Sequence, residues 1–502
     1  MRKLLVFFTG MLLFLQHGQA QFPIARHFWL NPNSYNHTLS PTSNGGYILA
    51  AAREELGGAG LKNTIAVLKL DNAYNIQHPQ TMGTDAQIIG LPGGSPSGFD
   101  AGVNFEVHDV TENTMVDDDG NVISFYVICG SIIKPGTQSM GMVAIVDQNL
   151  SVQSIREYPN AEVFYSVYAD GNYFYVCGKT PITATAFMQG IVLRDNIFVM
   201  IPTAYTTSEL WEYHKIIPNN NGRDIVVSGT FKTDYFIGFT AFDIASFGTP
   251  AAVLASRKFI MQLPIPPPNT IAPNPNSRVL VANDPNNQPR GFILSAMTPL
   301  WAGPNEIFTY FSTYTGLTNG YRMSGLPFSA SQQVFLEDMT TSPRTAAFPQ
   351  GRIAWVGHTM QPAANRGAFY IATDLSFAPL PNYIYFPSFV NPPRYSQLHK
   401  VHYNAGDFHC GGFYTHNNAT NDKTTYVVAP EQTIIGTNSC GRQMPAGSLN
   451  HLPLPGLNIL NVVPLIPVMW LSNTGHQVQY NFCDTDCDNV PLNLPSNSNC
   501  GN

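Results

Sequence analysis

The stretch DDGNVISFYVICG, residues 118–130, is the clearest copy of a phrase that returns along this chain of 502 residues. Each copy begins with a polar turn that ends in Gly, continues with a short β-rich run that ends on a small residue, and is followed by a second apolar run ending near an Asp. The further copies are SNGGYILAA (43–51), ADGNYFYVCG (169–178), NNGRDIVVSG (220–229), a degraded PNSRVLVAN (275–283), PQGRIAWVG (349–357) and NAGDFHCGG (404–412).

The turn residue of each copy marks the period of the repeat. The seven markers are Gly46, Gly120, Gly171, Gly222, Ser277, Gly351 and Gly406. Repeats of roughly 40 to 50 residues built from short strands are typical of propeller blades, and longer steps indicate loop insertions. The sequence therefore predicts an all-β fold, a seven-bladed β-propeller of four-stranded antiparallel blades.

The turns have the chemistry that tight hairpins require. Asp119-Gly120, Asp170-Gly171 and Asn221-Gly222 can adopt the positive φ angles of such turns. Five acids close the following strand, namely Asp71, Asp147, Asp195, Asp243 and Asp374. These acids could bind metal ions, or their side chains could accept hydrogen bonds from the amides of the turns. We favour the second interpretation.

The first residues have the layout of a secretory signal. Arg2 and Lys3 precede an apolar run, and Gly18 and Ala20 offer a small-residue exit, so we predict a signal peptide over residues 1–20. The propeller is expected over 21–482, with residues 21–34 pairing with the last blade to close the ring, strand-like pieces of the tail finishing that blade, and a cysteine-containing tail or linker over 483–502.

Composition agrees with an exported β-protein. Only 11% of the residues are charged, while 41 Gly and 39 Pro disfavour helices. A net charge of −7 offers no basic footprint for nucleic acid, and we find no convincing transmembrane segment. We expect a monomer that is secreted or at the cell surface, with a periplasmic location as the alternative.

The repeat resembles that of secreted β-propeller proteins of type IX-secreting and gliding bacteria. The similarity covers about residues 35–430 and lies in structural motifs, so it implies a ring of blades on an exported or cell-surface protein of the bacterial envelope. Such proteins usually end in a C-terminal sorting domain, which we do not find here. This leaves open a periplasmic location or a chain that is part of a longer protein.

The seven cysteines divide into two groups. Cys129, Cys177 and Cys410 are expected at matching, buried blade positions too far apart for disulfides among themselves. Four cysteines follow the repeats and are candidates for two disulfides, with zinc as the less favoured alternative: Cys440, Cys483, Cys487 and Cys500.

Histidines recur at one position of the repeat. A strand that ends on an apolar residue precedes each turn. Two residues before that apolar residue stand His37, His108, Tyr165, His214 and His399. If that strand is innermost, these side chains ring the central channel and could bind a metal or an anionic ligand. The alternative, which we favour, is that they hydrogen-bond to neighbouring blades. We assign no catalytic residue and no metal site.

Two functional hypotheses remain. The first is a binding or scaffold module that presents loops to a protein or polysaccharide partner, and the absence of nucleophile-elbow, Walker, dinucleotide and zinc-protease motifs favours it. The second is a propeller enzyme that acts on a glycan at the channel mouth. No cofactor is expected, although alternating acids in Asp484-Thr485-Asp486-Cys487-Asp488 leave calcium possible.

Overall fold

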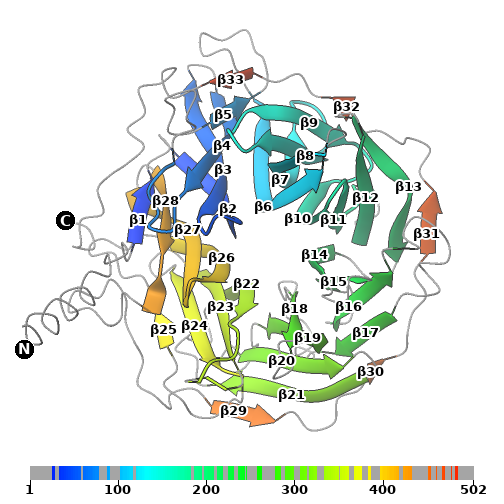
Figure 1. The fold of residues 1–502 in the computed structure, drawn as a ribbon, viewed down its shortest axis with the longest axis vertical. Helices are drawn as coiled ribbons and strands as arrows, with labels where there is room; N and C mark the ends of the chain where they lie inside the picture. Colours follow the sequence, from blue (N-terminus) through cyan, green and yellow to red (C-terminus); the bar gives the residue numbers. More distant parts are fainter. Residues whose placement is uncertain are drawn as a thin grey trace, which may run out of the picture.

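Seven antiparallel sheets stand around a central axis, with their first strands innermost (Figure 1). The computed structural model describes these residues: 25–28, 33–57, 60–77, 87–90, 102–116, 120–181, 186–194, 197–207, 212–218, 224–230, 236–243, 245, 257–262, 277–283, 289–298, 306–313, 316–324, 333–346, 348–349, 351–360, 367–375, 383–385, 396–417, 422–431, 450–453, 459–460, 466–469, 476–477 and 481–483. Their arrangement is that of a β-propeller, in which each sheet packs on its two neighbours.

We number the sheets in chain order and give their strands from the inside outward. Sheet 1 contains β2 (Asn33–Pro41), β3 (Tyr47–Gly57), β4 (Gly60–Leu70), β5 (Gln87–Gly90) and β33 (Asn481–Cys483). Sheet 2 contains β6 (Asn104–Val116), β7 (Val122–Ile133), β8 (Met140–Asp147), β9 (Val152–Tyr158) and β32 (His476–Gln477). Sheet 3 contains β10 (Val163–Asp170), β11 (Tyr173–Lys179), β12 (Ala186–Arg194), β13 (Ile197–Thr207) and β31 (Ile466–Met469).

The remaining four sheets follow the same plan. Sheet 4 contains β14 (Glu212–Pro218), β15 (Asp224–Thr230), β16 (Phe236–Asp243), β17 (Arg257–Gln262) and β30 (Ile459–Leu460). Sheet 5 contains β18 (Ser277–Asn283), β19 (Pro289–Thr298), β20 (Glu306–Thr313), β21 (Gly316–Ser324) and β29 (Asn450–Pro453). Sheet 6 contains β22 (Gln333–Thr341), β23 (Arg352–Met360), β24 (Ala368–Asp374) and β25 (Tyr383–Tyr385). Sheet 7 contains β26 (Ser396–Asn404), β27 (Asp407–Asn417), β28 (Asp422–Val428) and β1 (Ala25–Phe28).

The hydrophobic core lies between neighbouring sheets. Along β7, Tyr126 and Ile128 pack toward sheet 1, whereas Phe125, Val127 and Cys129 pack toward sheet 3. Successive side chains of a strand point to opposite faces, so a strand between two sheets buries both faces. This explains why the second strand of each copy is a nearly continuous apolar run rather than an alternating one.

The small residue at the end of that run has a steric cause. A Cβ atom on Gly130 would lie 1.8 Å from the carbonyl oxygen of Glu106, and one on Gly178 would lie 1.9 Å from that of Val163. The inner strand approaches too closely for any side chain at these positions. The turn glycines behave as predicted, since φ is +83° at Gly120.

The N-terminal strand closes the ring, as the sequence predicts. Strand β1 pairs antiparallel with β28, which joins Ala25 to Val428 and Phe28 to Thr425 in register. The last sheet therefore takes its outermost strand from the beginning of the chain, and residues nearly 400 positions apart become neighbours.

The prediction for the C-terminal segment is wrong. Strands β29, β30, β31, β32 and β33 do not complete sheet 7; they pair with the outer strands of sheets 5, 4, 3, 2 and 1 in that order. Five sheets therefore have five strands rather than the expected four. The outer edge of a sheet offers unpaired backbone groups, and the segment satisfies some of them as it passes around the ring.

The fifth copy of the repeat is also placed wrongly by the sequence. Ser277 does not stand in the turn after an inner strand, because β18, which begins there, is itself the inner strand of sheet 5. The second strand is β19, which pairs with β18 from Ser277 opposite Ala296 to Asn283 opposite Pro289. Both strands are short apolar runs, so the hydrophobic pattern does not distinguish them.

Candidate functional site

The inner strands of every sheet except sheet 5 carry a β-bulge at one shared position. The register of β6 on β7 shifts between Val107 and Asp109, and that of β14 on β15 shifts between Tyr213 and Lys215. The residues at the bulges of sheets 2, 3, 4, 6 and 7 are His108, Tyr165, His214, Glu337 and His399. An extra residue in one strand re-aims its side chain, and here it directs a row of polar groups toward the central axis.

We call these five residues the bulge layer, and four of them were predicted from the sequence. His108 and Tyr165 have ring centroids 5.1 Å apart, and those of Tyr165 and His214 are 5.6 Å apart. The imidazoles of His108 and His214 lie 3.6 Å and 3.8 Å from the carboxylates of Glu106 and Glu212. His37 belongs to the bulge of β2, but its side chain lies outside the described residues.

Glu337 is the polar centre of the other half of the bulge layer. Its carboxylate lies 3.2 Å from Nδ1 of His358 and 3.8 Å from Nδ1 of His399, and the guanidinium of Arg278 from sheet 5 lies 3.8 Å away. Burial opposes ionisation of Glu337, but its interactions with the two histidines outweigh it and hold its pKa well below the usual range. The group is therefore a half-buried carboxylate beside one guanidinium and two imidazoles, and burial lowers the pKa of the His399 imidazole.

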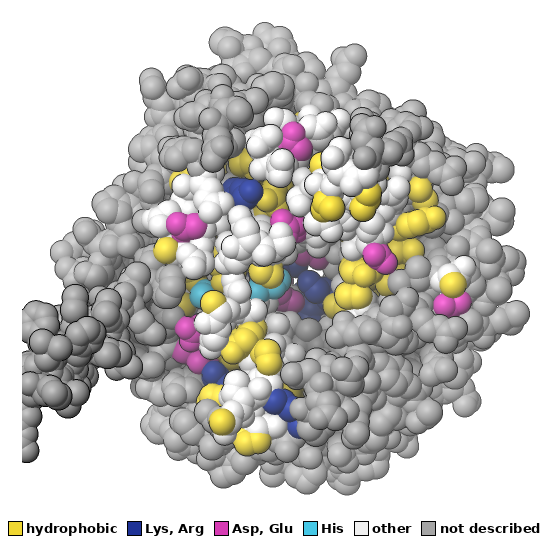
Figure 2. All heavy atoms as spheres, in the orientation of Figure 1, with side chains coloured by type: hydrophobic (Ala, Val, Ile, Leu, Met, Phe, Trp, Pro, Cys, Tyr) yellow, Lys and Arg dark blue, Asp and Glu magenta, His cyan; other side chains and the backbone are white. Residues whose placement is uncertain are grey.

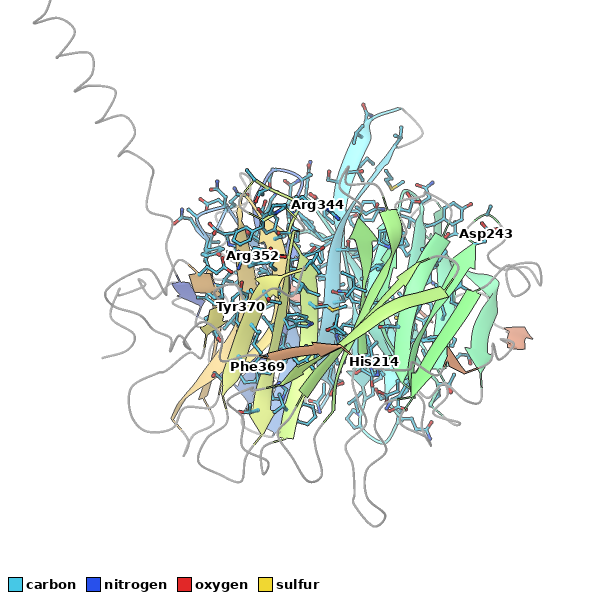
Figure 3. The ribbon with its side chains drawn as sticks, turned by 90° about the horizontal axis from the view of Figure 1, so that it is seen from below. His214, Asp243, Arg344, Arg352, Phe369 and Tyr370 are labelled. Carbon is cyan, nitrogen blue, oxygen red and sulfur yellow. The ribbon has the colours of Figure 1, made fainter. Side chains whose placement is uncertain are left out.

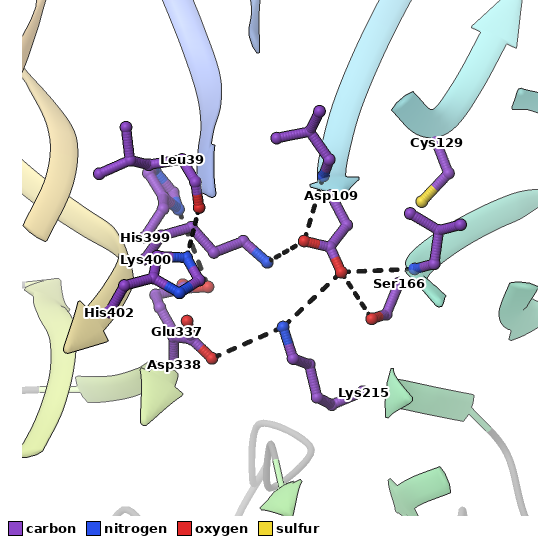
Figure 4. Close-up of polar contacts among 12 residues, drawn as sticks. Leu39, Asp109, Cys129, Ser166, Lys215, Glu337, Asp338, His399, Lys400 and His402 are labelled. Atoms are coloured by element: carbon purple, nitrogen blue, oxygen red, sulfur yellow. Dashed lines mark hydrogen bonds and ion pairs between the residues drawn. The ribbon is translucent and has the colours of Figure 1, made fainter. Parts of the chain in front are cut away.

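A second layer of charges follows one residue later along the same strands. Asp109, Lys215, Asp338 and Lys400, which we call the charged layer, come from sheets 2, 4, 6 and 7 and meet on the axis (Figure 4). Lys400 Nζ lies 2.7 Å from Asp109 Oδ1. Lys215 Nζ lies 3.6 Å from Asp109 Oδ2 and 4.0 Å from Asp338 Oδ1. The two carboxylates and two ammonium groups balance in charge.

Further hydrogen bonds hold the two carboxylates of the charged layer. Ser166 Oγ donates to Asp109 Oδ2 over 2.6 Å, and the amide of Val167 donates to the same oxygen over 3.3 Å. The amide of Val401 donates to Asp338 Oδ2 over 3.2 Å. Buried charges are tolerated only where such partners replace water, so the layer is an ordered part of the fold.

Charge pairing moves the pKa values of Asp109 and Lys215 away from neutral pH. Burial alone would raise the pKa of Asp109, but Lys215 and Lys400 lower it below its usual range. Burial would likewise lower the pKa of Lys215, but Asp109 and Asp338 raise it above its usual range. These groups stay ionised through the physiological range, which suits a structural role better than proton transfer.

Two histidines near the axis are held neutral. Burial lowers the pKa of His214 to about 3 and that of His402 to about 4. Nε2 of His402 contacts the carbonyl oxygen of Leu39, which ties sheet 7 to sheet 1. His402 is not one of the repeated histidines, but its contact is the kind of link between neighbouring sheets that we favoured for them.

Sequence reasoning missed the charged layer and Glu337. A partial signal was present, because Asp109, Lys215 and Lys400 each directly follow one of the predicted histidines, and Asp338 holds the equivalent place after Glu337. The four residues lie far apart in the sequence, so the sequence does not show that their charges neutralise one another. Figure 2 shows Lys or Arg, acidic and His side chains gathered in the hollow at the centre of one face.

The predictions for the cysteines and acids have mixed outcomes. Cys129, Cys177 and Cys410 are buried and free, as expected, but Cys410 lies one residue before the matching position, which is taken by Gly411 opposite Lys400. The Gly-Gly pair there shifts the alignment by one residue. Asp71 and Asp147 accept hydrogen bonds from amides in their own turns, which confirms capping at these two positions.

Several predicted features lie outside the described residues. These are the signal peptide, the side chains of Cys440, Cys483, Cys487 and Cys500, and the acids over 484–488. Among the residues that are described, no group of three or more His, Cys, Asp or Glu side chains is arranged to hold a metal ion. The same portion of the chain contains no helix long and apolar enough to cross a membrane.

No protein-family model and no curated protein sequence matches this chain. Solved structures with weak likeness include Sqt1 of Chaetomium thermophilum, with 9% identity and a TM-score of 0.39 over 81% of this chain and 98% of that one. The same protein bound to the N-terminus of a ribosomal protein has 8% identity and a TM-score of 0.36, over 80% and 98% of the two chains. A mutant NanB sialidase of Streptococcus pneumoniae has 10% identity and a TM-score of 0.36, over 82% and 71%.

Proposed function

We propose that this protein is an exported, seven-bladed β-propeller that binds a protein or polysaccharide partner at the cell envelope or outside the cell. Each of the seven sheets corresponds to one blade, and the bound partner contacts the loops and turns of one face. Location and partner rest on the signal-like first 20 residues, the sparse charge and the repeat. The protein acts as a scaffold rather than as an enzyme.

One observation carries the choice of binding over catalysis. The four groups of the charged layer are paired with one another, as in the pair of Asp109 and Lys400 at 2.7 Å. A general acid or base works best with a pKa near the operating pH, whereas pairing moves the pKa of Asp109 and Lys215 away from it. The channel centre therefore supports the ring and leaves recognition to the outer surfaces.

A glycan-acting enzyme is the second candidate, and Glu212 is the observation that favours it. Burial raises the pKa of Glu212 above its ordinary value, in the direction that a general acid requires. Lys179 lies between Glu212 and Glu162, at 3.4 Å and 3.1 Å from their carboxylates. Glu212 begins β14 and Glu162 directly precedes β10, and two carboxylates brought close together are the groups that glycoside hydrolysis uses.

The experiment compares binding with turnover in one preparation. Protein comprising residues 21–502 is immobilised and exposed to purified envelope proteins and polysaccharides of the cells that make it, and the same protein is screened against fluorogenic glycosides. Saturable binding at a defined stoichiometry without turnover is the expected result. Turnover that is lost in Glu212→Gln and retained in the control Glu112→Gln would refute the scaffold function and establish the enzyme.

A further inference from the structure

Strands β6 and β7 form a ribbon that rises above the rest of one face (Figure 3). We call this the turn face, because it carries the turns between the inner and second strands of the sheets. The neighbouring strand β8 pairs with β7 only from Phe125 opposite Asp147 onward. Residues 114–116 and 122–124 therefore form a two-stranded extension in which, among the described strands, each pairs only with the other.

The apolar surface of the described residues gathers at this ribbon. Val116 is 61% exposed, Val122 is 72% exposed and Ile123 is 38% exposed, and the fourth large exposed apolar side chain, Tyr173, stands at the turn of the next sheet. Val116 and Val122 are directly opposite in register, so their side chains lie on one face of the ribbon. Two-stranded ribbons are marginally stable when they stand alone in water.

The base of the ribbon is held on both sides by neighbouring sheets. Glu112 of β6 accepts hydrogen bonds from the amide and hydroxyl of Ser43 in the turn of sheet 1, the first at 2.5 Å and the second at 3.2 Å. Asn113 Nδ2 donates to the carbonyl oxygen of Gly171 in the turn of sheet 3, over 2.5 Å. These hydrogen bonds fix the base of the ribbon. Binding at the exposed valines therefore loses little conformational entropy of the ribbon.

The charged residues in the sequence of the ribbon have one sign. The chain between the two strands reads Asp117-Asp118-Asp119, and Asp170 lies in an exposed position at the turn beside Tyr173. From Glu112 to Ser124 the sequence contains four acids and no base. A partner that covers the patch must bring apolar side chains together with positive charge.

We propose that the β6–β7 ribbon is a docking site for an extended segment of a partner protein that alternates aliphatic residues with Lys or Arg. The segment pairs with the backbone edge at residues 122–124, its aliphatic side chains cover Val116 and Val122, and its cations complement the acids in the sequence of the ribbon. Addition of a strand to an exposed edge gives affinity through the main chain and specificity through alternate side chains. This proposal rests on the proposed binding function and names the class of partner.

The test uses a defined probe, a random library of 12-residue peptides displayed on phage and panned against residues 21–502. We expect the selected peptides to alternate aliphatic residues with Lys or Arg. The best peptide, synthesised with a fluorophore, should bind with at least about tenfold lower affinity to the variant Val116→Ser/Val122→Ser, because each valine loses its apolar contact. The control variant Thr137→Ala/Gln138→Ala, in the β7–β8 turn on the opposite face, should bind as the parent does.

A second variant tests the charge independently of the apolar contact. Asp117→Asn/Asp118→Asn/Asp119→Asn should weaken the peptide and reduce the salt dependence of its binding. Both variants change exposed or turn positions, and unchanged circular dichroism would show that they fold. Selected peptides without Lys or Arg, or equal affinity for parent and variants, would overturn the proposal.

Two further outcomes would replace the proposed partner by another. Valine-dependent dimerisation in analytical ultracentrifugation would assign the ribbon to a second copy of the chain. Valine-dependent binding to phosphatidylserine vesicles would assign it to a lipid surface. A partner or polysaccharide that binds the parent and the valine variant equally would refute the docking site while leaving the proposed function intact.

Discussion

Replacing Asp109 by Asn should destabilise the protein strongly, because this carboxylate is the shared acceptor of the charged layer. Asp109 is 5% exposed and Lys400 is 7% exposed, and the two are joined at 2.7 Å. Asp109→Asn leaves the ammonium of Lys400 buried without its counter-ion, and Lys215 keeps only the carboxylate of Asp338 at 4.0 Å. Removing one partner of a buried ion pair costs about 3–5 kcal/mol, so we expect a loss of that size.

A double-mutant cycle separates the ion pair from the rest of the site. Lys400→Met alone should cost about 3 kcal/mol, whereas Asp109→Asn/Lys400→Met should cost about 2–3 kcal/mol less than the sum of the single changes, because it leaves the pair of Lys215 and Asp338 balanced. The measurement is urea unfolding of residues 21–502 followed by tryptophan fluorescence, with a check that the slope against urea is unchanged.

The control for this cycle is the same substitution at an exposed aspartate. Asp170 lies at an exposed position in the turn of sheet 3. Asp170→Asn should therefore cost less than about 1 kcal/mol. If Asp109→Asn costs no more than this control, or if the cycle is additive within about 0.5 kcal/mol, the charged layer does not stabilise the ring as argued.

Three further predictions concern other contacts of the ring. His402 has a pKa of about 4 when folded and an ordinary value near 6.5 when unfolded, so its neutral state contributes stability above pH 6.5 that is lost as the pH falls toward 4. His402→Gln should remove about 3 kcal/mol from the pH dependence of the free energy of unfolding. Parallel curves of this free energy against pH for parent and variant would contradict this. Glu431 accepts hydrogen bonds from Arg352 Nη1 over 2.7 Å and from Tyr370 over 2.6 Å. Glu431→Gln should therefore lower the free energy of unfolding by about 3 kcal/mol. The control is Arg344→Gln at an exposed position, which should change this free energy by nearly zero. Deleting residues 21–32 removes β1 and should make β28 an open edge, detected as faster proteolysis and aggregation, whereas an equally stable monomer would show that ring closure needs no N-terminal strand.

The local features of the repeat were predictable because short-range chemistry determines them. A turn that needs positive φ selects Gly, as at Gly120 and Gly171, and a strand buried on both faces must be apolar throughout. The shared position of His108, Tyr165 and His214 followed from counting along equivalent strands. The binding role of these residues remains a prediction.

Two errors came from patterns that local sequence does not resolve. The two strands β18 and β19 are both short apolar runs, so the turn of sheet 5 was assigned one strand too early. The pairing of β29 to β33 with sheets 5 to 1 depends on which outer edges are open, and this is a property of the completed ring. Strand pairing between distant segments is decided by geometry rather than by the composition of either strand.

The sequence by itself determined an all-β repeat, its turns, and the closing role of its first strand, because each depends on backbone conformation or on burial of a strand. Only the tertiary structure decided that Asp109, Lys215, Asp338 and Lys400 meet on one axis. Other charged residues stand in the same strands, such as Glu106 in β6 and Glu337 in β22, so the sequence does not single these four out. The ring brings the four together, and the cost of burying each charge is offset only by the other three.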